Sequence, residues 1–191
     1  VLCRGLGYSE EETWKVSIAA MMHDVGKILV PTEIIEKPAR LTEQEYNEVK
    51  KHVEHGKMIL NKSSGEMMQI SRDIAYQHHE KWNGTGYLNY KGNEINKYAR
   101  CVAVADVFDA LVSKRPYKNA WRPEDAYNEI VSQSGEHFDP LVVNVFQQHY
   151  SEFLEIMKKY PDITCDMHED NACDEMQRKN NLEIITKKEN S

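Results

Sequence analysis

Residues 98–111, YARCVAVADVFDAL, are the most apolar stretch of the sequence and decide its fold class. The stretch is too long for a typical strand and rich in alanine, so we predict a buried helix. One carboxylate, Asp106, stands inside it. An ionised carboxylate in apolar surroundings is unfavourable unless it is paired or bound to a metal. Taken alone, Asp106 is more simply explained as a residue at the helix edge, so both interpretations stay open at this point.

Helices are also predicted on both sides of this stretch. Ser9, followed by three glutamates, begins a helix whose apolar positions keep helical spacing to Val25. Thr42 and Glu45 form a capping box that begins a helix ending at Leu60. Further helices are predicted over about 65–77, 123–135 and 139–160. No alternating strand pattern is present, so the sequence predicts an all-α fold around one core.

Length and charge exclude several classes of protein. A chain of 191 residues is long enough for one domain with an appendage. Lys and Arg number 24 against 31 Asp and Glu, a net charge of −7 without a basic run, which excludes DNA or RNA as the main partner. No apolar run approaches the roughly 20 residues that span a bilayer, and no export signal opens the sequence. The four cysteines form no CxxC pair, so we expect a cytoplasmic chain without membrane contact.

The two ends of the sequence differ in kind. From residue 161 onward the apolar periodicity is poor and acids outnumber bases, so we predict a domain over 1–160 and a polar acidic tail over 161–191. A short helix within 174–185 is compatible with this tail. The sequence begins with Val1, and we interpret it as part of a longer protein with an upstream regulatory domain.

Histidines and carboxylates concentrate at the predicted helix ends. Neighbours on a helix differ by about 100° in direction, so one metal rarely binds both His78 and His79. Two metals held about 3.5–4 Å apart could bind one each, and the same holds for His23 and Asp24. Taken singly, each pair is more simply explained as ordinary polar residues of the surface or core. Together, four imidazoles and two carboxylates without a thiolate indicate a dinuclear iron, manganese or zinc site, the kind that hydrolyses phosphate esters.

Six segments together resemble the HD-GYP family of HD-domain phosphohydrolases. They cover roughly residues 1–150 in the family's order, so the resemblance does not depend on one motif. The segments are HDVGK at 23–27, KPARLT at 37–42, HHEKWNGTGY at 78–87, VADVFDAL at 104–111, RPYK at 115–118 and GEHFDP at 135–140.

This resemblance implies an all-α HD-domain helical bundle around two or three divalent metal ions. Iron or manganese is expected first, with zinc or nickel as alternatives. His52 is preferred over His55 as a ligand because the family pattern places the ligand four residues before a glycine, here Gly56. The metal ligands implied by the resemblance are His23, Asp24, His52, His78, His79 and Asp106.

The resemblance also implies an activity and partners. The expected reaction opens cyclic di-GMP to linear pGpG or GMP in bacterial signalling, with Asp24 and Lys27 as catalytic residues. The residues expected to contact the substrate are Lys27, Tyr87, Arg115 and Lys118. The loop from Gly84 to Tyr87 resembles the family segment that contacts diguanylate cyclase partners.

Two departures from the family pattern leave alternatives open. Leu88 stands where the family has a proline, and the family places a further metal-binding histidine upstream of His23. A module that binds a nucleotide or a partner without turnover is one alternative. An HD phosphohydrolase for another nucleotide is the other, although the Gly-x-Gly-Tyr loop argues against it.

Overall fold

A computed structural model describes residues 1–114 and 120–161 of the chain. Contacts divide the chain into the units Val1–Lys159 and Tyr160–Ser191, and the helices of the described residues all lie in the first. These residues contain no strand, which confirms the predicted all-α class. The helices are α1 (Leu2–Gly5), α2 (Glu10–Ala20), η1 (Val25–Leu29), α3 (Thr32–Ile35), α4 (Glu43–Lys50), α5 (His52–Leu60), α6 (Glu66–Gln77), η2 (Gly92–Glu94), α7 (Lys97–Val112), α8 (Pro123–Ser132), α9 (Pro140–Gln148) and α10 (Tyr150–Lys159).

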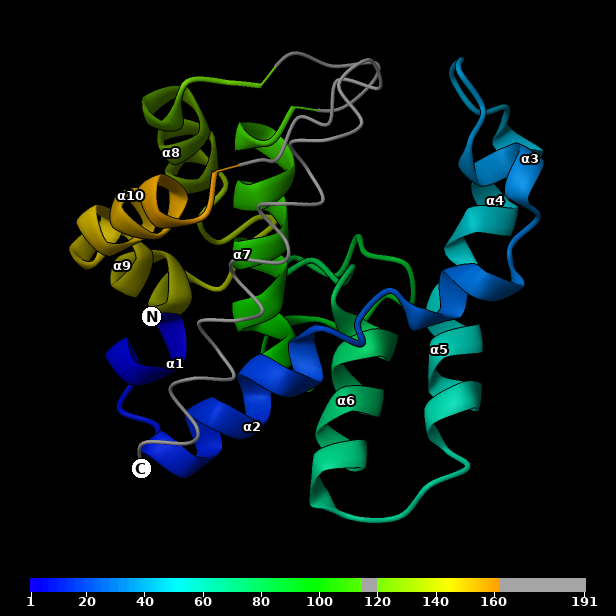
Figure 1. Ribbon diagram of the computed structural model, residues 1–191, viewed down its shortest axis with the longest axis horizontal. Helices are drawn as coiled ribbons and strands as arrows, with labels where there is room; N and C mark the ends of the chain where they lie inside the picture. Colours follow the sequence, from blue (N-terminus) through cyan, green and yellow to red (C-terminus); the bar gives the residue numbers. More distant parts are fainter. Residues whose placement is uncertain (115–119, 162–191) are drawn as a thin grey trace, which may run out of the picture. The chain divides into compact units, whose positions relative to one another are not determined.

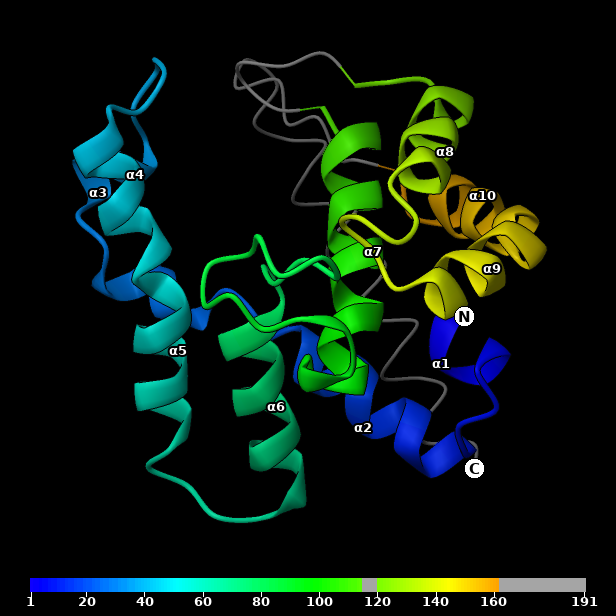
Figure 2. The ribbon, with the colours of Figure 1, turned by 180° about the vertical axis from the view of Figure 1, so that it is seen from behind.

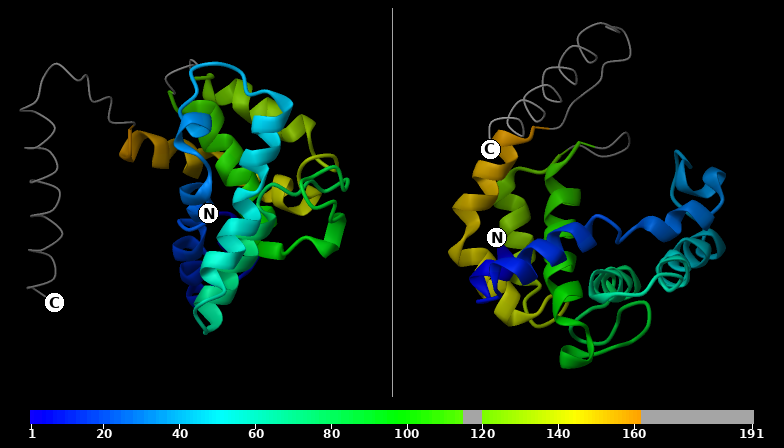
Figure 3. Two further views of the ribbon diagram at one scale, coloured as in Figure 1. Left: turned by 90° about the vertical axis from the view of Figure 1, so that its right-hand side faces the viewer. Right: turned by 60° about the horizontal axis from the view of Figure 1, so that its bottom comes forward.

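Helix α7 runs through the middle of this unit, with α8 and α9 on one side and α6 on the other (Figures 1 and 2). Helices α5 and α6 lie antiparallel beside each other, and α2 packs across α6 (Figure 3). No helix among the described residues is long and apolar enough to cross a bilayer. The predicted buried helix over 98–111 is therefore present as α7, the central element of the fold.

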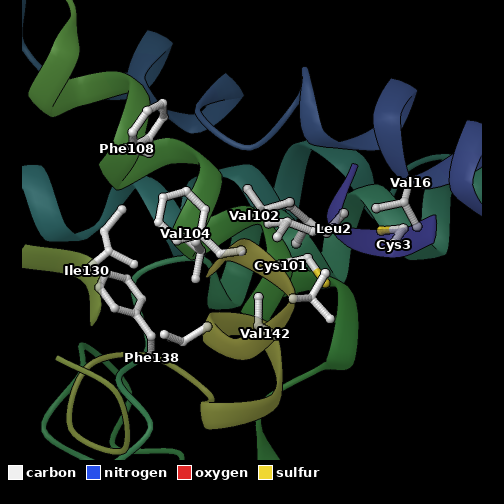
Figure 4. Close-up of a cluster of buried hydrophobic side chains, with 14 of the residues drawn as sticks. Leu2, Cys3, Val16, Cys101, Val102, Val104, Phe108, Ile130, Phe138 and Val142 are labelled. Carbon is white, nitrogen blue, oxygen red and sulfur yellow. The ribbon is translucent and has the colours of Figure 1, made fainter. Parts of the chain in front are cut away.

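The apolar core forms where α7 meets α8 and α9. Val104 and Phe108 of α7 lie with Ile130 and Phe138 in this core (Figure 4), and Phe146 belongs to the same cluster. The ring of Phe108 meets the ring of Phe146 edge to face at 5.4 Å. Burying rings of this size supplies much of the stabilisation that a domain of this length needs.

Side-chain caps fix where the helices begin. Ser9 accepts a hydrogen bond from the backbone N–H of Glu12, as the first predicted helix start requires. Thr42 and Glu45 make both hydrogen bonds of the predicted capping box. Asp139 caps α9 by accepting the N–H of Leu141. These local signals were readable from the sequence because each involves residues only two or three positions apart.

Three predicted helices are shorter than the sequence indicated. The helix from Ser9 ends at Ala20, because the backbone then tightens into turns that bond three residues back, and Val25 begins a separate 3-10 helix. The helix from Thr42 is divided at Lys51 and the last helix at His149. In each case the apolar spacing continues across the break, so periodicity alone predicted one continuous helix.

The helically spaced apolar residues of α2 face solvent. Trp14 is 59% exposed and Ile18 39%, as is Met21, just after the helix, at 74%, whereas the buried positions of this helix are Val16 and Ala19. Helix α2 therefore meets the core through its smaller side chains.

Candidate metal centre

A glycine brings η1 against α5 and so positions the first two candidate ligands. A Cβ at Gly26 would lie 1.9 Å from the carbonyl oxygen of His52 and 2.4 Å from the backbone nitrogen of Gly56. No other residue permits this approach without displacing the backbone. The turn just before η1 carries His23 and Asp24, and Asp24 is thereby held beside His52.

The other imidazoles come from the facing ends of α5 and α6. His52 is the first residue of α5, and His78 and His79 follow the last turn of α6. His52 and His78 are buried, with 1% and 2% of their surface exposed. The rings of His52 and His79 meet edge to face at 5.0 Å.

Backbone carbonyls select the tautomer of three of these histidines. His23, His52 and His78 each place Nδ1 against a carbonyl oxygen three or four residues earlier in the chain, at 2.7, 2.7 and 3.2 Å. A carbonyl only accepts, so Nδ1 carries a proton in all three, and Nε2 of the buried His52 and His78 presents its lone pair. Metal-binding histidines are oriented in this same way in other proteins.

The carboxylate of Asp24 lies at the point where these lone pairs meet. Its Oδ1 is 3.5 Å from Nε2 of His52 and 3.7 Å from Nε2 of His78. Its Oδ2 is 3.3 Å from Nε2 of His23. Asp24, His52, His78 and His79, here called the His/Asp cluster, each offer one ligand atom, and these atoms lie within 4.8 Å of one another.

The electrostatics keep the His/Asp cluster in the form that binds metal. Burial raises the pKa of the Asp24 carboxyl, but the neighbouring His23 and Lys27 outweigh burial and hold that pKa below its ordinary value. Burial, with the charges of the neighbouring imidazoles, lowers the pKa of His79 to about 2. Near neutral pH the carboxylate is ionised and this imidazole is neutral.

The residues present fit a divalent cation. Oδ1 of Asp24 is buried and has no hydrogen-bond partner among the described residues. Nε2 of His52 lies 3.5 Å from Nε2 of His78, and both present lone pairs. Buried acceptors that converge without a donor need a proton or a cation between them. Imidazoles with one carboxylate and no thiolate suit iron, manganese or zinc.

His23 and Asp106 extend the His/Asp cluster on one side. Nε2 of His23 lies 3.8 Å from Oδ1 of Asp106, and Asp106 is not itself among the residues of the His/Asp cluster. The Asp106 side chain is 27% exposed, so this carboxylate does stand at the edge of α7. His55 is not among the residues that meet here, and its Nδ1 is buried without a partner among the described residues.

Lys27 and Tyr87, two of the predicted substrate contacts, border the His/Asp cluster. Nζ of Lys27 donates to Oδ2 of Asp24 at 2.5 Å, and its side chain remains 41% exposed. The ring of Tyr87 lies 4.8 Å from the ring of His79. The other two predicted contacts, Arg115 and Lys118, lie outside the described residues.

Glu80 holds the loop that carries Tyr87, a function the sequence reasoning missed. Its side chain is buried, and its two oxygens accept the backbone N–H groups of Leu88 and Tyr90, both at 2.7 Å. An acid placed directly after two candidate ligands and shortly before a glycine turn was the available signal. Glu80 therefore positions the loop on which Tyr87 faces the histidines.

Comparison with known proteins identifies the family. The HD domain family matches residues 1–142. The "3'3'-cGAMP-specific phosphodiesterase 2" of Vibrio cholerae is 43% identical over 157 residues, which are 82% of this chain and 30% of that protein. The "Cyclic di-GMP phosphodiesterase" of Thermotoga maritima is 40% identical over 158 residues, 82% of this chain and 43% of that protein. This chain thus spans less than half the length of either relative.

A solved structure has the same fold. Bd1817, a HDG"Y"P protein from Bdellovibrio bacteriovorus, superimposes with a TM-score of 0.62 at 20% identity, covering 81% of this chain and 48% of that one. At this identity the likeness concerns the fold alone. The sequence match to the family and to the phosphodiesterase relatives carries the classification, and the chain belongs to the HD domain family, in its HD-GYP type.

Proposed function

We propose that this chain is a metal-dependent phosphodiesterase that opens a cyclic dinucleotide, with cyclic di-GMP giving linear pGpG or GMP. One observation carries the proposal: the Nε2 lone pairs of His52 and His78 converge on Asp24, whose Oδ1 is buried without a partner among the described residues. The relatives that are named as phosphodiesterases for cyclic di-GMP and 3'3'-cGAMP support the choice of substrate class.

The proposed ligands form two groups around Asp24. The His/Asp cluster would hold one ion, and His23, Asp24 and Asp106 would hold a second, since Nε2 of His23 lies near both carboxylates. The donor set favours iron or manganese, with zinc or nickel as alternatives. The proposal also allows for a third ion. Such ions, when bound, neutralise phosphate charge and make water more acidic.

Lys27 has two proposed tasks beside these ligands. Its contact with Asp24 keeps that carboxylate ionised and in one orientation. An ammonium group has three donors, and Asp24 occupies one of them, so the remaining donors are available to a phosphate oxygen. Charge that develops on phosphorus during attack by water is stabilised by such a fixed donor.

The remaining proposed contacts surround the reacting phosphate. Tyr87 covers the His79 side of the His/Asp cluster and faces the sugar or base of the substrate. Arg115 and Lys118 are proposed to contact phosphate and base, as the family resemblance implies. The loop from Gly84 to Tyr87 is the proposed contact for a cyclase partner.

The proposal places the activity in the domain over 1–160, acting in the cytoplasm, with 161–191 as an acidic tail. Cys3 and Cys101 are free thiols, which supports a reducing compartment. We also propose that an upstream regulatory domain of the full protein controls this activity.

The test compares metal-loaded and metal-free chain. Protein loaded anaerobically with Fe²⁺ or Mn²⁺ is incubated with cyclic di-GMP, and the products are separated by chromatography. We expect linear pGpG or GMP from the loaded chain, none after chelation, and at least about a 100-fold lower rate from Asp24→Asn. Intact cyclic di-GMP after incubation with fully loaded chain would refute the proposal and favour a module that binds without turnover.

A second candidate substrate is 3'3'-cGAMP, because the 43% identical relative is named as specific for it. The ratio of kcat/KM for the two cyclic dinucleotides, measured on the same metal-loaded preparation, decides between them. A ratio within about threefold of one would mean that the site does not discriminate the second base.

A further inference from the structure

Helix α4 places an aromatic ring and a lysine beside the proposed active site. Tyr46 and Lys50 are four residues apart and share one face of this helix. The ring of Tyr46 meets the ring of Tyr87 edge to face at 6.2 Å, and their hydroxyls are 3.5 Å apart. Tyr46 is 45% exposed, so this surface is open to a ligand.

Lys50 differs from the lysines around it in having no carboxylate to neutralise it. Lys37 donates to Glu45 at 2.6 Å, and Lys51 donates to Glu48 at 2.5 Å. No carboxylate of the described residues lies within 4 Å of Nζ of Lys50, which instead stands 5.2 Å from the Tyr46 ring centre.

Tyr87 connects this surface to the His/Asp cluster. Nζ of Lys50 lies 6.0 Å from the centre of the Tyr87 ring, whose other contacts are His79 at 4.8 Å and His52 at 6.4 Å between ring centres. Tyr46, Lys50 and Tyr87 are here called the α4 ledge. The α4 ledge is therefore continuous with the residues proposed to hold the metal.

A cyclic dinucleotide needs contacts of this kind away from the metals. It carries two phosphates and two purines, and only one phosphate can lie at the reacting position. In a chain of net charge −7, the other phosphate requires a local cation that no acid has neutralised. A cation held by aromatic rings keeps its full charge and its donors, and the rings also offer a face on which a purine can stack.

We propose that the α4 ledge binds the nucleotide that is not being cleaved, with Lys50 on its phosphate and Tyr46 against its purine. This inference rests on the proposed function and adds Tyr46 and Lys50 to its substrate-binding residues. Lys50 is expected to bind the substrate equally strongly in the ground state and in the transition state. Its loss should therefore raise KM and Kd and leave kcat unchanged.

The test uses Lys50→Gln and Tyr46→Leu in the metal-loaded full chain. Lys51→Gln is the matched control, since it removes the adjacent lysine, which already has a carboxylate partner. Affinity is measured with a non-hydrolysable phosphorothioate analogue of cyclic di-GMP, and turnover with cyclic di-GMP and with bis(p-nitrophenyl) phosphate, which has no second nucleotide. Lys50→Arg tests whether the charge alone is required.

We expect Lys50→Gln to raise Kd and KM about tenfold, Tyr46→Leu to raise them about fivefold, and Lys50→Arg to restore most of the affinity. Turnover of bis(p-nitrophenyl) phosphate and every value for Lys51→Gln should stay within about twofold of wild type. Equal Kd values for Lys50→Gln and Lys51→Gln, or no analogue binding by wild type, would overturn the inference. Lys50-dependent analogue binding without hydrolysis by wild type would support the α4 ledge and refute the proposed function instead.

Discussion

The apolar core beside α7 and the His/Asp cluster between α5 and α6 are both buried, but they are completed in different ways. In the core, Phe146 is fully buried and packs among other apolar groups. In the His/Asp cluster, His52 and His78 are equally buried, yet their Nε2 atoms and Oδ1 of Asp24 face one another without a donor. The core is complete within the chain, whereas the cluster is complete only with a cation.

One helix belongs to both regions. Helix α7 packs Val104 and Phe108 into the core and directs Asp106 toward His23. The position of the second proposed metal is therefore fixed by the apolar core, although its ligands are polar. Because the two regions are completed differently, the core can be damaged and the metal can be removed separately.

The largest effect is expected for Phe146→Ala in the core. The ring lies 5.4 Å from Phe108 and 4.9 Å from Phe153, and its loss leaves a cavity among rigid neighbours. We predict a decrease of about 3–5 kcal/mol in the free energy of unfolding, measured by urea denaturation. Metal bound per folded chain should stay at the wild-type value. A decrease below about 1 kcal/mol would mean that the core is less completely packed than its burial indicates.

Metal binding should stabilise one region more than the other. At a free Mn²⁺ concentration about 100 times Kd, we predict a gain of about 2.7 kcal/mol in the free energy of unfolding. Hydrogen exchange should slow mainly in α5, in the end of α6 and in η1, which hold the His/Asp cluster, with little change in α9. The same slowing in α9 and α5 would contradict the division into two regions.

Asp106→Ala should affect the metal without affecting the fold. The side chain is partly exposed and alanine favours helix, so the free energy of unfolding should change by less than about 1 kcal/mol. Elemental analysis should find about one metal ion fewer per chain, because the second proposed position loses a carboxylate. Unchanged metal content would remove Asp106 from the ligands, and unfolding would show that the metal supports the core.

A pH dependence is also expected from His137, which lies outside the His/Asp cluster. Burial, with a smaller contribution from Lys81, lowers the pKa of His137 to about 4, and its ring stacks on Phe138. In the unfolded chain this imidazole takes up a proton near pH 6.5, whereas in the folded chain it does so only near pH 4. The contribution of His137 to stability is therefore fully present above about pH 6.5 and is lost as pH falls toward 4.

His137→Gln should therefore show a shallower loss of stability than wild type over this pH range. Urea unfolding of metal-free protein at pH 7, 6, 5 and 4 measures the difference between the two proteins. Parallel curves for wild type and variant would show that His137 titrates normally in the folded chain.

Much of the helical fold was predictable because its signals are local. The apolar run of 98–111, the capping box at Thr42 and the acids after Ser9 each involve neighbouring residues, and all three helices are present. The breaks at Lys51 and after Ala20 were not predictable. The approach of Gly26 to α5 is a tertiary contact between residues far apart in the sequence, and no periodicity records it.

The candidate site was predictable to a similar extent and for a similar reason. The sequence motifs indicated which histidines to consider, and the structure brings His23, His52, His78 and His79 around Asp24. The sequence motifs did not indicate the residues around these histidines, because the roles of those residues depend on contacts that form only in the folded chain. Glu80 matters because it accepts hydrogen bonds from the backbone of a loop, and the α4 ledge exists only because α4 packs beside that loop.

The most direct test of the proposed metal centre compares two histidines on one helix. His52 faces Asp24 and His55, three residues later, does not. Mn²⁺ or Fe²⁺ affinity is measured by anaerobic equilibrium dialysis for wild type, His52→Ala and His55→Ala, with circular dichroism to confirm that each is folded. We predict at least about a 100-fold loss of affinity for His52→Ala and a change within about threefold for His55→Ala. Equal affinities for the two variants would contradict the proposed metal centre.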